Sequence, residues 1–472
     1  MRNFFCLGAL LVVALGLEAG LGANWPQFRG TDGSGVAPEG RPPVEFGPQK
    51  NVVWRVALPP GHSSPCIWGE RIFLTAAEKG RLETLCLSQK DGTILWRQPV
   101  PVEKIEPTHR IASPAAPTPA TDGERVYVYF GSFGLLAYDL DGREQWRKAL
   151  PVPVVEFGAS SSPVIAGELL VQVCDQDVDS YLLAVDRKTG KTTWRTERTE
   201  FRRGFATPLV WRHDGIEELV VCGSVWLRGY DLRDGKERWT TRGMARVANA
   251  SPVAGEGMVF VSSWNIGGDP GDRLNLPPYK EFAEKNDKNK DGKFAKDEFP
   301  VGPFRDRFSQ FDANKDGAVT VEEYEAMEMM FAQAENALFA VRPGGRGEVT
   351  STHVAWKVGR DLPYISSPLY YQGRVYTMKN GGMFSCYHAK DGKAAYSAER
   401  VGVVGDYYSS AVAADGRIYV ASQRGVVVVL AAGDQFKVLA RNDLGESVMS
   451  SPAVVDGRIY LRTEKHLYCF GE

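Results

Sequence analysis

The stretch Leu182–Trp194, with the sequence LLAVDRKTGKTTW, decides the fold class of this chain. It consists of an apolar strand, an Asp-x-x-Thr-Gly turn and a second strand that ends in tryptophan. Asp186 can accept hydrogen bonds from the amides of the turn, and Gly190 can adopt the positive φ that such a turn requires. The stretch therefore predicts two antiparallel strands. Related copies end at Trp96, Trp146 and Trp239, and weaker copies end at Trp356, at Tyr396 and near Val438.

A second pattern lies between successive copies of the first. It contains a small residue that is usually followed by proline, an apolar strand, a polar turn and another apolar strand. Its copies begin at Ser64, Thr118, Ser162, Thr207, Ser251, Ser367, Ser410 and Ser451. One copy of each pattern supplies four strands, which is one blade of a β-propeller with a usual repeat of roughly 40 to 50 residues. The sequence therefore predicts an all-β fold, an eight-bladed β-propeller.

The two ends of the repeat are incomplete in complementary ways. The last unit ends with His466–Phe470 and lacks a fourth strand, whereas the segment from Asn51 to Val56 is a strand with Trp54 and no strands before it. We expect these two strands to pair, because pairing closes the ring and removes the exposed edges of an open array.

The repeat between Trp239 and Trp356 is longer than the usual repeat by about 70 residues. This insertion leaves after the predicted strand Met258–Ser263 and returns at the predicted strand Ala337–Arg342, so it lies in a loop between the second and third strands of its blade. We expect four segments in the chain, namely a signal peptide at 1–23, propeller at 24–264, a small α-helical inserted pair of motifs at 278–334 and propeller at 335–472.

The insertion contains two loops with oxygen-bearing residues at alternate positions, glycine at position 6 and glutamate at position 12. This is the EF-hand pattern, in which the final glutamate binds calcium through both oxygens. The first loop supplies Asp287, Asn289, Asp291, the Lys293 carbonyl and Glu298, with water expected at position 9, where Ala295 stands. The second loop supplies Asp312, Asn314, Asp316, the Ala318 carbonyl, Thr320 and Glu323.

We expect two calcium ions and a β-bridge between Phe294 and Val319, which stand at position 8 of the two loops. Pro300 and Pro303 shorten any helix between the loops, which leaves little room for the opening that a calcium sensor uses. The insertion is therefore predicted to be a structural module rather than a sensor.

The repeats resemble the tryptophan-docking repeats of quinoprotein dehydrogenases and of the BamB-type outer-membrane assembly lipoprotein. They resemble more closely the secreted bacterial PQQ-binding-like propeller repeat proteins, whose N-terminal WPQFRG sequence stands at Trp25–Gly30. This resemblance implies that the tryptophans pack between blades and that the repeated aspartates, such as Asp139, Asp186 and Asp231, are structural. It also implies that the face carrying the insertion binds partners.

The resemblance also raises the question of a quinone cofactor. The dehydrogenases hold pyrroloquinoline quinone against a disulfide between adjacent cysteines, beside a calcium ion and a catalytic aspartate. No two cysteines are adjacent in this chain, so we do not expect the quinone to bind, and no catalytic residue is assigned. Cys86, Cys386 and Cys469 occupy a third-strand position where a small residue fits, and we expect them to be free and buried.

Met1–Ala23 has a basic start, a short apolar run and small residues at its end, which is typical of a secretory signal peptide. We therefore expect a secreted or periplasmic protein with no transmembrane segment in the mature chain. The net charge of −2 provides no basic excess to bind phosphates, which argues against nucleic acid as a partner.

We predict a monomeric, non-catalytic interaction scaffold whose partner is another envelope or extracellular protein or a glycan. A BamB-like outer-membrane assembly factor and a PQQ-dependent oxidoreductase are the alternatives, although no lipid-anchor cysteine supports the first. A hydrolase or lyase is a further alternative, but His62, His109 and His388 form no recognisable catalytic pattern.

Overall fold

The strands β12 (Tyr181–Asp186) and β13 (Thr192–Glu197) pair antiparallel around the turn that the repeat predicts, and Gly190 has a φ of 70°. The computed structural model describes residues 24–269, 271 and 273–472. The expected signal peptide at 1–23 lies outside the described residues. Among the helices in the described ranges, none combines the length and the apolar character that crossing a membrane demands.

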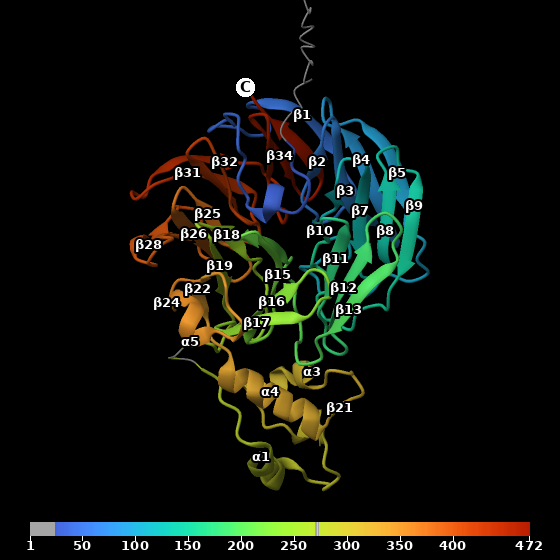
Figure 1. Ribbon diagram of the computed structural model, residues 1–472, viewed down its shortest axis with the longest axis vertical. Helices are drawn as coiled ribbons and strands as arrows, with labels where there is room; N and C mark the ends of the chain where they lie inside the picture. Colours follow the sequence, from blue (N-terminus) through green and yellow to red (C-terminus); the bar gives the residue numbers. More distant parts are fainter. Residues whose placement is uncertain (1–23, 270, 272) are drawn as a thin grey trace, which may run out of the picture.

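Eight twisted sheets surround a central axis and form the blades of a propeller, which confirms the predicted fold (Figure 1). The first blade consists of β2 (Cys66–Trp68), β3 (Arg71–Glu78), β4 (Arg81–Ser88) and β5 (Ile94–Pro99), and the second of β6 (Ala120–Thr121), β7 (Arg125–Phe130), β8 (Gly134–Asp139) and β9 (Glu144–Ala149). The third consists of β10 (Val164–Ala166), β11 (Leu169–Cys174), β12 and β13. The fourth consists of β14 (Leu209–His213), β15 (Ile216–Cys222), β16 (Trp226–Asp231) and β17 (Glu237–Arg242), with β23 (Gly347–Glu348) added at its edge.

The other four blades follow the same order of strands. The fifth consists of β18 (Val253–Gly255), β19 (Met258–Ser263), β22 (Ala337–Val341) and β24 (Val354–Val358), with α5 (Thr350–His353) before β24. The sixth consists of β25 (Leu369–Tyr371), β26 (Arg374–Lys379), β27 (Met383–His388) and β28 (Ala394–Arg400), and the seventh of β29 (Val412–Ala414), β30 (Arg417–Ala421), β31 (Val426–Ala431) and β32 (Val438–Asp443). The eighth consists of β33 (Ala453–Val455), β34 (Arg458–Arg462), β35 (His466–Phe470) and β1 (Val52–Ala57).

The ring closes through the two chain ends, as predicted. Strand β1 pairs antiparallel with β35, and Trp54 lies opposite Cys469. A ring of hydrogen bonds around the axis also links the blades. Eight serine or threonine residues each stand at the start of a blade, and the backbone N–H of each one donates to the hydroxyl oxygen of the equivalent residue in the next blade. These N···O distances are 2.9 to 3.0 Å, and they link Ser64, Thr118, Ser162, Thr207, Ser251, Ser367, Ser410 and Ser451 into a closed circle.

The tryptophans join neighbouring blades by a repeated contact. The Trp146 indole N–H donates to the Arg187 carbonyl at 2.9 Å, and the ring of Trp146 lies against Gly190 in that same turn. The same contact recurs from Trp54 to Gln89, from Trp96 to Leu140, from Trp194 to Leu232 and from Trp356 to Ala389. A side chain on the turn glycine would collide with the indole ring, so the glycine is needed for contact as well as for φ.

The residue opposite each tryptophan in the sheet is small because the indole ring lies over it. Ala184 stands opposite Trp194, and Cys86 stands opposite Trp96 in the same register. Cys386 and Cys469 occupy the equivalent position. All six cysteines in the described residues are free and buried, which confirms the expectation for Cys86, Cys386 and Cys469.

Trp239 lies among buried residues of its own and the next blade, but its indole N–H departs from this contact. Its indole donates to the buried Glu218 carboxylate of its own blade at 2.8 Å, and its ring meets Trp211 edge-on. The next blade carries α5 in place of the usual turn, so no turn carbonyl is offered to this indole. Strand β23 pairs with β17 here and adds a fifth strand to this blade.

The segment that precedes β1 crosses one face of the ring and contacts blades on several sides. It includes the WPQFRG sequence and a short 3₁₀ helix, η1 (Thr31–Gly33). Its contacts are a bridge from Trp25 to Ile67, a bond from Thr121 to the Pro26 carbonyl, a bond from Arg29 to the Pro368 carbonyl, an ion pair from Asp32 to Arg212 and a bridge from Val36 to Ala413. This segment therefore covers one end of the central channel.

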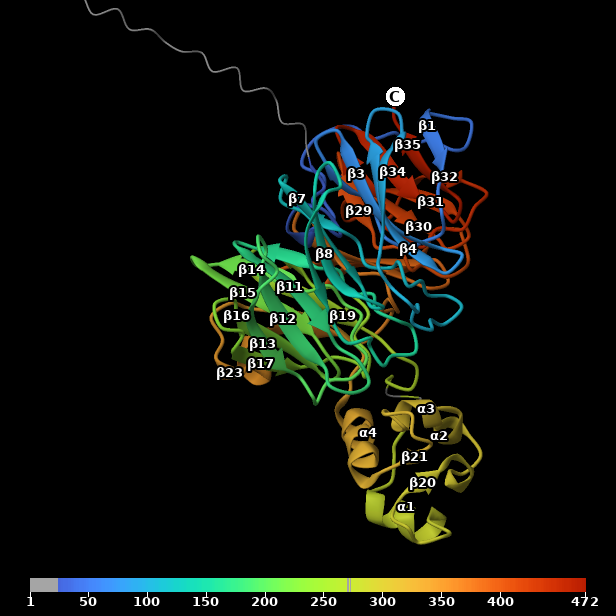
Figure 2. The ribbon, with the colours of Figure 1, turned by 90° about the vertical axis from the view of Figure 1, so that its right-hand side faces the viewer.

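The insertion forms a separate lobe at the rim of the propeller in both views (Figures 1 and 2). Its elements are α1 (Tyr279–Asn286), β20 (Phe294–Ala295), η2 (Lys296–Glu298), α2 (Pro303–Asp306), α3 (Phe308–Phe311), β21 (Ala318–Val319) and α4 (Val321–Gln333). A cluster of buried aromatic and methionine side chains fills its interior and includes Val225 of the propeller. The lobe is thus packed against the blade beside its own.

Candidate calcium module and central pocket

The two predicted calcium loops have matching local geometry. In the first loop Asp287 Oδ2 accepts the Gly292 N–H at 3.1 Å, and in the second Asp312 Oδ2 accepts the Gly317 N–H at 3.0 Å. Both glycines have positive φ, at 76° and 93°, which allows the sharp bend at position 6. The predicted bridge between position 8 of each loop is confirmed, because β20 and β21 pair antiparallel through Phe294 and Val319.

The final glutamate of each loop folds back over the loop. Glu298 accepts the N–H groups of Lys288 and Ala295, both at 2.9 Å. Glu323 accepts those of Ala313 at 2.9 Å and Thr320 at 3.0 Å. These bonds hold each carboxylate against the same loop that carries the other predicted oxygen ligands.

The donor chemistry of the loops fits a hard cation. Asp287 Oδ1 is buried and has no hydrogen-bond partner in the described part of the chain, so it is free to coordinate an ion. The bonds that Asp316 accepts from the Ala318 N–H and from Asn314 hold the pKa of this exposed carboxyl below its usual range. Within residues 24–269, 271 and 273–472, no three His, Cys, Asp or Glu side chains converge as a metal site. The predicted loop ligands differ from such a cluster, since they include asparagine and backbone carbonyl oxygens.

The second loop begins where the insertion touches the propeller. Arg202 donates to the Gln310 carbonyl at 3.3 Å, and Arg203 donates to the Ser309 carbonyl at 3.2 Å, just before Asp312. On the other side Arg246 lies 4.3 Å above the Phe331 ring of α4. Three arginines of the propeller therefore fix the orientation of the lobe.

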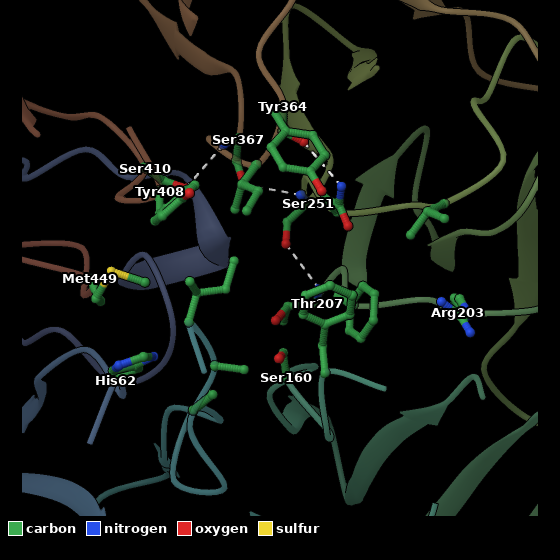
Figure 3. Close-up of a pocket in the computed structure, with 18 of the residues that line it drawn as sticks. His62, Ser160, Arg203, Thr207, Ser251, Tyr364, Ser367, Tyr408, Ser410 and Met449 are labelled. Carbon is green, nitrogen blue, oxygen red and sulfur yellow. Dashed lines mark hydrogen bonds between the residues drawn. The ribbon is translucent and has the colours of Figure 1, made fainter. Parts of the chain in front are cut away.

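A pocket of about 400 Å³ occupies the central channel on the side of the insertion. Its inner wall contains the eight hydroxyls of the closed circle, and Figure 3 shows Thr207, Ser251, Ser367 and Ser410 arranged around it. Phe28 of the N-terminal segment also lines the pocket. The channel therefore has a floor at the N-terminal segment and an open mouth beside the insertion.

A second tier of side chains lines the pocket two residues before each hydroxyl. Alternate residues of an extended chain point the same way, so this position faces the axis in every blade. In contrast to the hydroxyls, the chemistry of this tier differs from blade to blade. Its members are His62, Ala116, Ser160, Phe205, Asn249, Ile365, Tyr408 and Met449. The sequence reasoning missed this tier, although its signal is present as the varied position within an otherwise regular pattern.

The three histidines considered in the sequence analysis do not meet in a catalytic group. His62 lines the pocket, and burial together with the nearby Arg462 lowers its pKa to about 4, so it is neutral at physiological pH. The His109 ring lies against that of Phe157, with 4.8 Å between ring centroids and a tilt of 44°. His388 lies on β27, 3.9 Å from Asp434. Each ring has a separate structural environment.

A buried carboxyl, Glu106, is expected to make stability depend on pH. Glu106 is 6% exposed, its Oε1 accepts only a long bond from the Ala159 N–H at 3.4 Å, and its Oε2 has no partner among the described residues. Burial raises the pKa of Glu106 from the ordinary range of a glutamate to about 7. A raised pKa in the folded state stabilises the protein at low pH, and this contribution is lost as the pH rises through 7.

Glu106→Gln is expected to remove this dependence, because the amide stays neutral. In urea unfolding, the variant should gain up to roughly 3 kcal/mol over the wild type between pH 5 and pH 8, at 1.36 kcal/mol per pKa unit. The exposed Glu103→Gln serves as the matched control and should follow the wild type. Parallel pH profiles for Glu106→Gln and the wild type would show that Glu106 does not titrate as described.

Comparison with known proteins agrees with both parts of the structure. Residues 46–222 match the family model described as outer membrane protein assembly factor BamB, and residues 304–328 match the EF-hand model. The chain is an eight-bladed β-propeller that is similar to BamB over residues 46–222 and carries an insertion similar to an EF-hand. The EF-hand match covers the second predicted loop, and the first loop lies outside it.

One curated relative is the outer membrane protein assembly factor BamB of Alkalilimnicola ehrlichii, which is 31% identical over 163 residues. The match covers 32% of this chain and only 37% of the relative. The crystal structure of BamB from Moraxella catarrhalis has a TM-score of 0.53 and 13% identity, covering 89% of this chain and 98% of that chain. A quinohemoprotein alcohol dehydrogenase from Comamonas testosteroni has a TM-score of 0.54 and 12% identity, covering 95% and 81% respectively. At these identities the likeness to both structures concerns the fold alone.

Proposed function

We propose that this protein is an exported, calcium-binding propeller that acts as a non-catalytic interaction scaffold. The observation that carries the proposal is the pair of matching EF-hand loops on a lobe fixed to the propeller. Each loop combines a glycine bend, a folded-back glutamate and a position-1 aspartate. The ligands we assign are Asp287, Asn289, Asp291, the Lys293 carbonyl, Glu298, Asp312, Asn314, Asp316, the Ala318 carbonyl, Thr320 and Glu323.

Calcium has a structural role in this proposal. Helices α2 and α3 are each a single turn, and α3 runs directly into Asp312. The carbonyls of Ser309 and Gln310 are held by arginines of the propeller, so opening the two hands would break the docking contact. Bound calcium would instead stiffen the lobe in its docked position.

The proposed partner is an envelope or extracellular protein or a glycan. Export through the signal peptide at 1–23 and a periplasmic or secreted location belong to this proposal. The name of the BamB relatives, assembly factor, supports a role in binding proteins. The lobe rises from a loop between the second and third strands of its blade, so it is presented at the rim where a partner can reach it (Figure 2).

The fold likeness to a quinohemoprotein dehydrogenase does not favour a redox enzyme here. The described cysteines are dispersed over several blades, so they cannot form the adjacent pair that the dehydrogenase resemblance requires. Dye reduction by the purified protein with added quinone and calcium, well above a heat-killed control, would favour the oxidoreductase instead.

Titration calorimetry is expected to show two calcium ions per wild-type chain. Glu298→Gln and Glu323→Gln should each remove one, because each loses the carboxylate that binds through both oxygens. The first site should be weaker, because four lysines surround its carboxylates and lower the local attraction for a cation. They are Lys288, Lys290, Lys293 and Lys296. Glu322→Gln is the matched control next to Glu323 and should bind two ions.

The same variants test the scaffold. Cross-linked capture from the native envelope should yield a protein or glycan that wild type retains in calcium and loses with a chelator or in the Glu298→Gln, Glu323→Gln double variant. The thermal transition of the propeller should persist in that double variant, because ring closure does not pass through the insertion. One calcium site or none in the wild type, or collapse of the propeller transition, would contradict the proposal.

A further inference from the structure

The central pocket is lined by a ring of hydroxyl side chains, one from each blade, and by a second ring whose side chains differ from blade to blade. Each hydroxyl of the closed circle accepts a backbone N–H, and none donates a hydrogen bond to another described residue. These hydroxyl protons are therefore available to a ligand or to water in the channel. In the varied tier, Phe205, Ile365, Tyr408 and Met449 line the same space and provide apolar contact for a ligand. Figure 3 shows Tyr408 and Met449 at this wall.

The mouth of the pocket is positively charged. Its charged lining residues are Glu156, Arg203, Arg246 and Arg307. Glu156 pairs with Arg203 at 3.0 Å, and Arg203 also pairs with Asp177 at 2.7 Å. Neither Arg246 nor Arg307 has a carboxylate partner within residues 24–269, 271 and 273–472; the bonds that they donate go to the carbonyls of Ile266 and Pro303.

The two arginines without a carboxylate partner among the described residues reach the mouth from different parts of the molecule, and Arg246 also lies 4.3 Å above the Phe331 ring. Arg246 belongs to the propeller, where it is 9% exposed, and Arg307 lies between α2 and α3 of the insertion. Burial, followed by repulsion from Arg307 and Arg203, lowers the pKa of Arg246 to about 10. A bound anion would offset both the burial and the repulsion. Since Arg307 comes from the insertion, the propeller repeat alone does not supply this charge.

We propose that the central pocket binds a small organic anion, with its acidic group between Arg246 and Arg307 at the mouth and an aromatic or aliphatic body against the varied tier. The pocket volume of about 400 Å³ lies within the range of sites for small organic ligands. The floor at Phe28 limits the length of the ligand, so a long polymer passing through the channel is not accommodated. The open mouth beside the lobe is the entry route.

Calorimetry at low salt with 4-phenylbutyrate and phenyl phosphate as probes tests this site on the full chain. At least one of the two probes should bind with a stoichiometry of one. The neutral 4-phenylbutan-1-ol and inorganic phosphate should each bind at least about tenfold more weakly, because the alcohol lacks the negative charge and phosphate lacks the apolar body. Arg246→Gln and Arg307→Gln should each weaken binding by about tenfold or more, as expected for a charge-assisted bond.

Arg305→Gln is the matched control, since Arg305 lies on α2 two residues before Arg307 and is not part of the pocket lining. It should bind the probe like the wild type. The midpoint of thermal unfolding should be the same in Arg307→Gln as in the wild type. Arg307→Gln then tests the site even if Arg246→Gln weakens the docking of the lobe, because Arg246 also contacts Phe331. Absence of binding by both aromatic anions, equal binding of the alcohol, or an equal loss in Arg305→Gln would overturn the proposal.

Discussion

Trp54→Ala is expected to lower the free energy of unfolding by about 3–5 kcal/mol, the usual range for a buried tryptophan. Trp54 is 8% exposed on β1, opposite Cys469, and its ring lies 6.0 Å from that of Tyr460. Its indole N–H donates to the Gln89 carbonyl at 3.1 Å in the first blade. One side chain therefore joins the last blade to the first, and its removal weakens the closure of the whole ring.

Urea unfolding followed by tryptophan fluorescence and circular dichroism measures this effect. Val53→Ala is the matched control, because Val53 is the neighbouring residue on β1 and is 41% exposed. It should stay within about 0.5 kcal/mol of the wild type, as is usual for surface positions. Equal stabilities for Trp54→Ala and Val53→Ala would mean that the ring does not depend on this contact.

Asp175→Ala is also expected to lower the free energy of unfolding by about 3–5 kcal/mol, because it leaves a buried charge without its partner. Arg198 and Asp175 form a two-fold contact, with both N···O distances at 2.8 Å, and both side chains are 0% exposed. The Arg198 guanidinium also lies 3.9 Å above the Phe201 ring. Without Asp175 this guanidinium would remain buried in the wall between the third and fourth blades.

An exposed ion pair on the same strand region provides the control. Glu197 pairs with Arg195 at 2.7 Å, and its side chain is 58% exposed. Glu197→Ala should cost at most about 1 kcal/mol, since solvent already screens that pair. Chemical unfolding of both variants at pH 7 makes the comparison. A loss for Asp175→Ala no larger than that for Glu197→Ala would show that water reaches Arg198 when its partner is removed.

The blades and the closure could be predicted from the sequence because their signals are local. Leu182–Trp194 contains both strands and the turn between them, and the same spacing recurs along the chain. The incomplete ends predicted the pairing of β1 with β35, which the structure confirms with β1 at Val52–Ala57 rather than from Asn51. The EF-hand loops were equally local, and their bridge at Phe294 and Val319 followed from position within each loop.

Contacts between distant segments could not be predicted in this way. Trp239 ends a regular copy of the repeat, but its indole binds Glu218 because the following blade has no turn to receive it. The WPQFRG sequence was noted only as a family feature, whereas its place across the channel depends on bonds to several blades, such as the one from Arg29 to the Pro368 carbonyl. Nothing near these residues in the chain specifies such partners.

The sequence by itself therefore determined the number of blades, the closing strand and the positions of the two EF-hand-type loops, because each shows as a residue pattern that is local in the chain. Only the tertiary structure decided how the central pocket is built, where varied residues such as Phe205 and Met449 meet around one axis. It also decided that Arg246 of the propeller and Arg307 of the insertion share one mouth. The physical reason is that ring closure and lobe docking bring together side chains whose separation in the chain contains no periodic signal.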